Sequence, residues 1–351
     1  MHAVLVINPG STSTKLAVYK DTKQIAADTI VHPAETLKKY KHIWEQFDFR
    51  LDAIRTWIKN QSVKPDAIAA MGGLLKPVTG GTYEINESML HDARNNYQGE
   101  HPSNLGCALA HEIAKDFTCN AYIVDPVSVD EFEPLARYSG HPLIERQTLS
   151  HALNIHATAR KAAGDMNISP DTSSFIIAHL GGGISIAPVK GGRIIDVNDA
   201  SSDGPFSPNR TGGLPLQQFI TLCFSEKYSE HEMRTMVMGK GGLIAYLETA
   251  AAQDIEQRIG AGDTKAREIY EAMAYQIAKE IAAMATVLKG NVDAIVLTGG
   301  LAGSELLTGW IIERVKFLSD IKIYPGEHEM DALASAVHRV INGTETVKEY
   351  T

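Results

Sequence analysis

Compact apolar runs alternate with amphipathic stretches along the whole chain. Ala3–Ile7 and Leu16–Tyr19 are short and apolar and flank a polar turn, which predicts two buried strands joined by a hairpin. Residues 34–60 place apolar side chains at helical spacing and predict one long amphipathic helix. The other elements predicted in the first half are strands at 28–32, 65–70 and 121–124 and a helix from Ser103 to Phe117.

The second half repeats this plan. Phe175–Leu180 reads as a buried strand, Gly181–Gly183 as a hairpin and Ile184–Ala187 as the returning strand. A long Ala-rich helix is predicted at 264–288, followed by a strand at 292–297 and a glycine loop at 298–303. Two copies of a strand–hairpin–strand core predict a duplicated α/β architecture with a cleft between its halves.

Composition narrows the class of protein. A chain of 351 residues exceeds the usual size of a single core, so two domains are expected. The formal net charge of −9 argues against nucleic acid or an anionic membrane as the main partner. Three widely spaced cysteines and the lack of an apolar leader or span predict a cytoplasmic protein with reduced thiols.

The turn after the first strand has the composition of a phosphate-binding loop. Asn8 to Lys15 reads N-P-G-S-T-S-T-K, in which Gly10 allows close backbone approach and a positive φ. Backbone N–H groups, the hydroxyls of residues 11–14 and the Lys15 ammonium can neutralise phosphate oxygens. The spacing is not that of a Walker loop. Taken alone, the segment would favour an ordinary polar hairpin.

Eight ordered motifs extend this observation over nearly the whole chain. They are N-P-G-S-T-S-T-K at 8, H-P-S-N-L-G at 101, V-D-P-V at 124, S-H-A-L-N at 150, H-L-G-G-G at 179, G-P-F-S-P-x-R at 204, V-L-T-G-G at 296 and P-G-E-x-E-M at 325. Together they resemble the butyrate kinases of the acetate and acyl kinase family, which is part of the actin-like ATPase superfamily.

The resemblance implies a fold, a reaction and partners. The fold would be a duplicated actin-like ATPase, with ribonuclease H-like domains and an interdomain cleft. Residues 1–148 with 330–351 would carry the phosphate hairpin and the acyl substrate, and residues 149–329 the nucleotide. The reaction would be reversible phosphoryl transfer from ATP to a short-chain carboxylate, giving ADP and an acyl phosphate. It also implies Mg²⁺ dependence and a homodimer or larger homo-oligomer.

The resemblance assigns four catalytic residues, each with a plainer alternative. His179 would contact the γ-phosphoryl group, or be a half-buried histidine of a sheet. His151 would donate to the acyl phosphate, or simply begin a helix. Arg210 would bind the phosphoryl group or the substrate carboxylate, or be a solvated loop residue. Asp125 would hold Mg²⁺ or its water, or cap the turn at Pro126.

Further residues are assigned to binding. The phosphate-binding set is Asn8, Ser11, Ser13, Lys15, Gly181, Gly182 and Gly183. The nucleotide-binding set is Gly299, Gly300, Leu301 and Ala302, with Gly239–Gly242 also expected near the adenosine. Asn8 and Glu329 are expected at the metal, although Glu329 is also placed to cap a helix that starts at Met330.

One position departs from the family pattern. Butyrate kinases typically carry Arg where this chain has Met71, and that Arg helps to bind the carboxylate and the phosphoryl group. Its loss predicts slow turnover, or replacement by Lys76 or Arg94. The alternatives are therefore an impaired relative that binds nucleotide or acyl phosphate without efficient turnover, and an acetate or propionate kinase. An actin-like filament or chaperone-like protein is disfavoured, because it would not need His179, Arg210 and His151.

Overall fold

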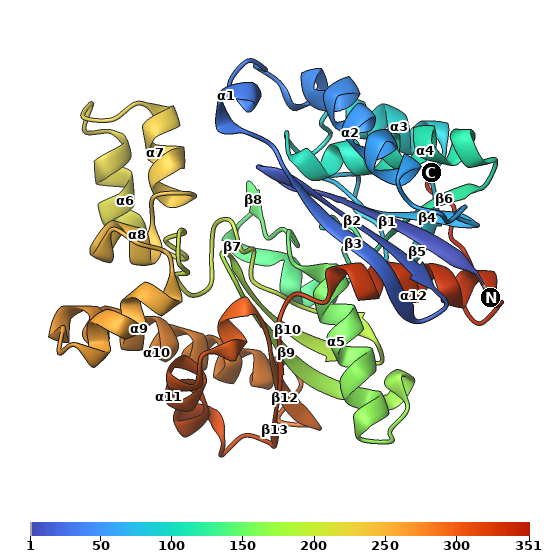
Figure 1. The fold of residues 1–351 in the computed structure, drawn as a ribbon. Coiled ribbons are helices and arrows are strands. Elements are labelled where there is room, and N and C mark those ends of the chain that lie inside the picture. The colour runs from blue at the N-terminus through green and yellow to red at the C-terminus, as the bar shows by residue number, and fades with distance from the viewer. Residues whose placement is uncertain (1) are drawn as a thin grey trace. The chain divides into compact units, whose positions relative to one another are not determined.

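The computed structural model describes residues 2–351, which form two compact units (Figure 1). One unit combines the residues up to Asp130 with His328–Thr351, and the other spans Glu131–Glu327. The predicted domain limits, the roles assigned to the two domains and the cleft stay predictions. Among residues 2–351, no helix is long and apolar enough to cross a membrane.

The first unit is built on a mixed six-stranded sheet with the order β3-β2-β1-β4-β6-β5. β1, β2 and β3 form an antiparallel meander, whereas β4 and β6 run parallel to β1. Every residue of β1 is buried, as expected for a central strand covered on both faces. The strands are β1 (Ala3–Pro9), β2 (Ser13–Lys20), β3 (Lys23–Val31), β4 (Ala67–Met71), β5 (Thr82–Glu84) and β6 (Asn120–Val124).

Helices cover both faces of this sheet. α2, α3 and α4 lie over one face and α12 lies along the other (Figure 1), and both α4 and α12 contact β1, β4 and β6. The helices are α1 (Ala34–Leu37), η1 (Ile43–Gln46), α2 (Phe47–Lys59), α3 (Glu87–Arg94), η2 (Pro102–Asn104), α4 (Leu105–Phe117) and α12 (Glu329–Ile341), where η marks a 3₁₀ helix. The last segment of the chain thus completes the core of the first unit.

The single helix predicted over residues 34–60 was wrong. The segment forms α1, a turn, η1 and then α2, and His42 between them has an extended backbone with φ −122° and ψ 151°. The intervening run Lys38-Lys-Tyr-Lys-His42 offers few apolar side chains to bury against the sheet. Because helices in proteins depend mainly on packing of an apolar face, the chain leaves the helix there.

The second unit contains a five-stranded sheet with the order β11-β10-β9-β12-β13. β9, β10 and β11 are antiparallel, whereas β12 and β13 run parallel to β9. The strands are β9 (Ser174–Leu180), β10 (Ile184–Lys190), β11 (Arg193–Ile194), β12 (Ala294–Gly299) and β13 (Ile321–Pro325), with a separate hairpin of β7 (Tyr138–His141) and β8 (Ile144–Glu145). A three-stranded meander followed by parallel strands therefore occurs in both units, which confirms the predicted duplication.

The long helix α10 organises the core of the second unit. Its inner face, which includes Tyr270, Met273 and Ile277, is buried beneath the sheet and against α9 and α11. The helices of this unit are η3 (Pro134–Arg137), α5 (Ala152–Asp165), η4 (Pro170–Thr172), α6 (Leu216–Cys223), α7 (Glu230–Val237), α8 (Gly242–Leu247), α9 (Ala252–Gly260), α10 (Thr264–Val287), η5 (Gly300–Gly303) and α11 (Glu305–Val315).

Candidate active site

The predicted phosphate hairpin is the turn between β1 and β2. Gly10 N donates a hydrogen bond to Ser13 O (2.8 Å), and His32 N donates to Thr12 O (2.8 Å). Ser11 and Thr12 are exposed. Among residues 2–351, no protein group accepts a hydrogen bond from the backbone N–H of Ser11 or Thr12. Two N–H donors of the turn are therefore available to an anion.

Two details of the hairpin differ from expectation. Gly10 does not adopt a positive φ, and an added Cβ would meet no atom closer than 3.6 Å, so the turn itself does not require glycine at this position. Thr14 is fully buried, and its hydroxyl lies 2.9 Å from Nε2 of His32. The hydroxyl contribution predicted for residues 11–14 is thus restricted to the others, while Lys15 pairs with Asn8 across the strands on the opposite face from Thr14.

Three parallel strands of the first sheet end at one edge. The carboxyl ends of β1, β4 and β6 bring Asn8, Met71 and Asp125 to this edge. Asn8 Nδ2 donates to Glu329 Oε2 at 2.7 Å, which joins the two residues predicted to bind metal. Glu329 is also the first residue of α12, where a carboxylate is favoured by the helix dipole. The expected cap of a helix starting at Met330 was wrong, because α12 begins at Glu329 itself and His328 is the N-cap. The role of Glu329 at the metal stays a prediction.

Asp125 is buried and holds a neighbouring loop. Its exposed fraction is 1 %, its φ is 39°, and Oδ1 accepts a hydrogen bond from Gly81 N at 2.7 Å. Asp125 N donates in return to Gly81 O (3.0 Å). This reciprocal pair ties the loop at Gly81 to the end of β6. A role of Asp125 at Mg²⁺ stays a prediction.

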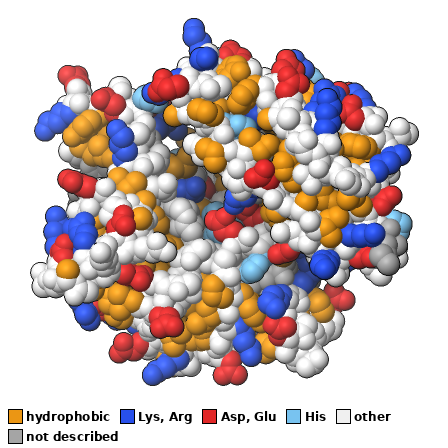
Figure 2. Space-filling model, in the orientation of Figure 1, with side chains coloured by type: hydrophobic (Ala, Val, Ile, Leu, Met, Phe, Trp, Pro, Cys, Tyr) orange, Lys and Arg blue, Asp and Glu red, His pale blue; other side chains and the backbone are white. Residues whose placement is uncertain are grey.

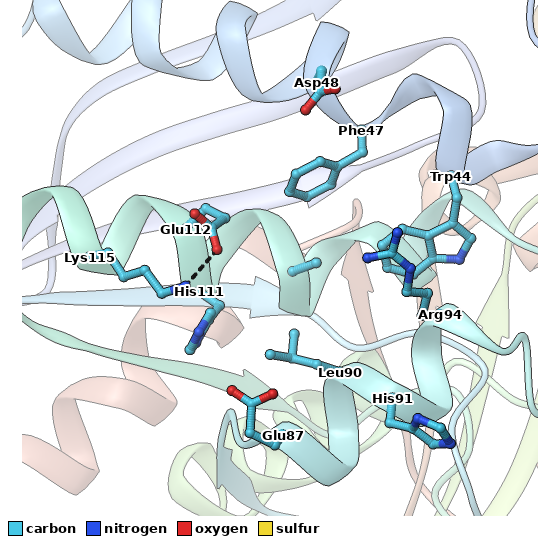
Figure 3. Close-up of a pocket in the computed structure, with 11 residues that line it drawn as sticks. Trp44, Phe47, Asp48, Glu87, Leu90, His91, Arg94, His111, Glu112 and Lys115 are labelled. Carbon is cyan, nitrogen blue, oxygen red and sulfur yellow. Dashed lines mark hydrogen bonds and ion pairs between the residues drawn. The ribbon is translucent and has the colours of Figure 1, made fainter.

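The cations suggested as replacements for the missing arginine have other partners. Nζ of Lys76 lies 2.9 Å from Asp92 Oδ2. Arg94 lies over the ring of Trp44, at 5.8 Å from the centroid, and lines a pocket of about 630 Å³ between α2, α3 and α4 (Figure 3). Neither contact leaves its cation directed at the carboxyl end of β4, so the structure gives no support to a replacement of Arg by these residues at position 71.

Two histidines form the centre of the second unit's site. His179 lies near the end of β9 and His151 is at the N-cap of α5, and their rings stack with centroids 4.0 Å apart. Nδ1 of His179 donates to Oδ1 of Asn154 at 3.0 Å. Nδ1 of His151 lies 2.9 Å from Ser185 Oγ. Each ring is therefore fixed by a hydrogen bond at Nδ1, which leaves Nε2 for a ligand.

Arg210 lies against the glycine turn that follows His179. A Cβ placed on Gly183 would come within 2.6 Å of Arg210 Nη1, so only glycine accommodates the guanidinium here. Nη1 also donates to Ala200 O at 2.8 Å. His179, Gly181, Gly183 and Arg210 are thus brought together as predicted, within one unit.

The protonation states of this group follow from its burial. Burial lowers the pKa of His179 to about 4; the negative charge of Glu327 opposes this shift and the positive charge of Arg210 adds to it. Burial and the charges of His179 and Arg210 hold the pKa of His151 well below its usual value of 6.5. Both imidazoles are neutral at pH 7. Burial also lowers the pKa of Arg210, but a guanidinium stays charged in proteins.

The predicted nucleotide loop follows β12 at the same edge of the second sheet, since Thr298 pairs with His179. Gly299 has a φ of 88° and its α-carbon lies against the backbone of Leu180, which requires glycine. Gly300 is exposed, whereas Ala302 is buried with an exposed fraction of 3 %. The loop therefore offers a ligand mainly the backbone of Gly300 and Leu301.

Sequence analysis missed two residues that order the site. Asn154 belongs to the S-H-A-L-N motif, and its position three residues after His151 placed both on one helical face. That spacing could have identified it. Arg50 has no such signal, because it lies within a helical pattern and its contacts with the hairpin are to residues 36 to 39 positions earlier.

The comparisons with known proteins agree with this geometry. Residues 146–349 match the model of the acetokinase family. The chain belongs to this family. A probable butyrate kinase 2 of Caldanaerobacter subterraneus subsp. tengcongensis is 50 % identical over 353 residues, with 100 % of both chains covered. The butyrate kinase 2 of Clostridium acetobutylicum is 47 % identical, with 99 % of both chains covered. The resemblance stated from the sequence is confirmed.

Solved structures confirm the fold. The acetate kinase of Porphyromonas gingivalis superimposes with a TM-score of 0.80 at 16 % identity, covering 96 % of this chain and 99 % of the other. A propionate kinase of Francisella tularensis gives a TM-score of 0.76 at 18 % identity, with the same shares covered. The actin-like ATPase architecture predicted for the acetokinase family is therefore the architecture of this chain.

Proposed function

We propose that this chain transfers the γ-phosphoryl group of ATP to butyrate or a branched C4–C5 carboxylate, reversibly and in line, to give an acyl phosphate. Family membership and full-length relatives named butyrate kinase confirm the predicted class, a phosphotransferase with a carboxyl group as acceptor. The observation that carries the proposal is the guanidinium of Arg210 seated on Gly183 beside the stacked pair His151–His179.

This set of groups suits an anionic nucleophile. A carboxylate attacks phosphorus without first losing a proton, so no strong general base is needed. Catalysis then depends on alignment and on stabilising negative charge at the transferring group. Arg210 supplies a permanent cation for this purpose, and the N–H groups of residues 181–183 supply neutral donors.

His179 would contact the phosphoryl group through Nε2. Because Nδ1 donates to Asn154, the neutral ring carries its lone pair at Nε2. An approaching phosphoryl group raises the pKa of the imidazole by adding negative charge, and Nε2 then takes up a proton and donates to a phosphoryl oxygen. His151, stacked on this ring and fixed by Ser185, donates to the acyl phosphate from the same unit.

The first unit would hold the phosphates and the metal. The exposed N–H groups of Ser11 and Thr12 bind phosphate oxygens, together with Ser13 and Lys15. Asn8 and Glu329 are hydrogen-bonded neighbours and offer an amide oxygen and a carboxylate. Two protein ligands suit Mg²⁺, because this ion keeps several waters and phosphate oxygens as its other ligands. Among residues 2–351, no cluster of three or more His, Cys, Asp or Glu forms a closed metal centre. When bound, Mg²⁺ would neutralise charge on the phosphoryl oxygens.

The nucleotide would lie against the second unit. Gly299 and Gly300 allow the backbone to approach a phosphate or a purine closely, and Leu301 follows in the same loop, partly buried against the core. Ala302 contributes by packing the loop onto the core. We propose a cytoplasmic location, because the reaction would use ATP in one direction and ADP with acyl phosphate in the other. The free cysteines Cys107, Cys119 and Cys223 agree with a reducing compartment.

We also propose that the chain forms a homo-oligomer through α6. None of the residues of α6 is buried, although Leu216, Phe219 and Ile220 are apolar. Leu216 is 72 % exposed, and Phe224 just after the helix is 83 % exposed. Elsewhere, acidic and basic side chains are interspersed over the visible face (Figure 2). An exposed apolar helix is typical of a protein interface, and light scattering on a Phe224→Glu variant would show a smaller particle if α6 is that interface.

The proposed activity is tested by trapping acyl phosphate with hydroxylamine. Purified chain is incubated with Mg-ATP and acetate, propionate, butyrate or isobutyrate, and the hydroxamate is measured. Turnover that is highest with four-carbon acids supports the proposal, whereas a maximum with acetate or propionate would reassign the substrate. Tight binding of ATP without any hydroxamate would favour the impaired relative that Met71 suggests.

A further inference from the structure

Arg50 lies in the core directly behind the phosphate hairpin. Its exposed fraction is 0 %, and it is the largest side chain of the fully buried class. It projects from the first turn of α2 toward the turn between β1 and β2. A buried arginine is rare in proteins unless a carboxylate accompanies it.

The partners of Arg50 are all neutral. Nη1 donates to Ser13 O and Thr14 Oγ1, each at 3.1 Å, and Nη2 donates to Ser11 O at 3.4 Å. Nε and Nη2 also donate to Gln46 Oε1, at 3.1 and 3.0 Å. Among residues 2–351, no carboxylate forms an ion pair with this guanidinium.

The positive charge persists at neutral pH. Burial lowers the pKa of Arg50 to about 10, which keeps the guanidinium protonated at pH 7. The neighbouring His32 does not offset or add to this charge, since burial and Arg50 lower the pKa of His32 to about 4. The core behind the hairpin therefore holds one cation without a compensating anion.

The same contacts set the direction of the peptide groups in the turn. The carbonyls of Ser11 and Ser13 accept from Arg50, and the carbonyl of Thr12 accepts from His32 N. With three successive carbonyls bonded to the protein, the free N–H groups of Ser11 and Thr12 are left for solvent or a ligand. This is the arrangement of an anion-binding nest, with a cation on its inner side.

We propose that Arg50 is a positioning residue of the phosphate site, which holds the carbonyls of the hairpin inward and contributes the positive charge that a bound phosphate compensates. The proposal rests on the proposed function only in taking the hairpin as the phosphate site. Arg50 itself touches no ligand, because Ser11 and Ser13 separate it from the surface.

The sharpest test is Gln46→Glu. This near-isosteric change turns the side-chain amide that accepts two hydrogen bonds from Arg50 into a carboxylate. It gives the guanidinium a counter-ion and leaves no cavity in the core. We expect the variant to melt at the same temperature as the parent or higher, since the buried charge gains a counter-ion. We expect the Kd for inorganic tripolyphosphate and for ATP, measured by calorimetry, to rise about tenfold or more.

Matched variants separate charge from general damage. Gln61→Glu makes the same change just past the other end of α2, about 20 Å along the helix, and should leave both Kd values unchanged. Arg50→Met removes the cation and should weaken tripolyphosphate binding at least as much as Gln46→Glu. Arg55→Met, on the same helix at an exposed ion pair with Asp116, is its control and should bind as the parent does.

The outcomes are distinct from those for the overall function. If Gln46→Glu folds and binds tripolyphosphate as tightly as the parent, the proposal is overturned even though the parent makes acyl phosphate. If Arg50→Met does not fold, Gln46→Glu decides the question. A parent that binds tripolyphosphate but makes no hydroxamate would contradict the proposed function and leave the role of Arg50 to the same binding measurements.

Discussion

The rings of His151 and His179 stack face to face, with 14° between their planes and 4.0 Å between their centroids. Two imidazoles at this distance cannot both be protonated without strong repulsion. The pair therefore offers its ligand one ring that gains a proton and one that remains neutral. This asymmetry suits a site that must stabilise charge only while the phosphoryl group is in transit.

Loss of His179 should remove transition-state stabilisation. We expect His179→Gln to lower kcat by about 10²- to 10³-fold, with a much smaller change in KM, because one donor to the developing charge is lost. Hydroxamate formation under saturating butyrate measures the effect. His231→Gln, at an exposed position on α7, is the control. Near-parental kcat in the His179 variant would exclude the role proposed for this ring.

Substitution of Gly183 should displace Arg210. The Cβ of Gly183→Ala would lie 2.6 Å from Nη1, so the guanidinium must move, and kcat/KM should fall by about 10- to 100-fold. As a control, Gly309→Ala on α11 meets no atom within 4 Å and should behave as the parent. Neither glycine has a positive φ, so the two Ala variants do not differ in backbone strain. Equal activity of the two variants would refute the argument.

Arginine at position 71 should improve the enzyme. Met71 ends β4 beside Asn8, so a guanidinium there would reach the same sheet edge as the predicted metal ligands. A charge-assisted contact of about 1.5–3 kcal/mol corresponds to a gain in kcat/KM of about tenfold or more. Met166→Arg, at the end of α5, controls for the added charge. An unchanged kcat/KM for Met71→Arg would show that the site does not need this contact.

Glu329 should govern the requirement for Mg²⁺. We expect Glu329→Gln to raise the Mg²⁺ concentration for half-maximal activity by about tenfold or more, because the carboxylate that accepts a hydrogen bond from Asn8 is lost. Asp331→Asn on the same helix, where the carboxylate accepts from Tyr19 OH, should leave the Mg²⁺ dependence unchanged. A parallel shift in both variants would point to damage to α12 instead of a metal contact.

Acid should destabilise the folded chain through its neutral histidines. The pKa values of His32 and His179 are about 4 when folded, against about 6.5 unfolded, so the unfolded chain binds more protons between these values. The free energy of unfolding should therefore fall as the pH drops from 6.5 toward 4, by the order of 1–3 kcal/mol for each histidine. Urea unfolding at pH 7 and pH 5 measures this loss. His32→Gln should lose less stability than the parent over that interval; an equal loss would contradict the assignment.

The local pattern of apolar and turn residues was sufficient to predict much of the fold. β1, β9 and β12 are compact apolar runs between turn residues, and their burial on both faces is what such runs indicate. The glycines after His179 and after Thr298 were recognised because each follows a strand end, where parallel strands present their carboxyl ends. These features depend on a few consecutive residues, so a short window of sequence is enough to predict them.

Features that depend on residues far apart in the sequence could not be predicted from it. The break within residues 34–60 depends on which apolar side chains the sheet can cover, and the pattern alone does not contain that information. Arg50 appears in the sequence as one of several charges on a helix, yet its role is set by carbonyls on another strand. The buried hydrogen bond between Asp125 and Gly81 likewise joins loops 44 positions apart.

The return of α12 to the first unit has a consequence for how the protein is made. Asn8 and Glu329 are separated by 321 positions, and β1 and β4 pack on a helix that leaves the ribosome only after the entire second unit. A nascent chain therefore carries an unfinished first sheet with one bare apolar face during most of its synthesis. An apolar sheet face that waits for its covering helix favours aggregation of the partly made chain, so slow folding of the second unit would prolong that exposure.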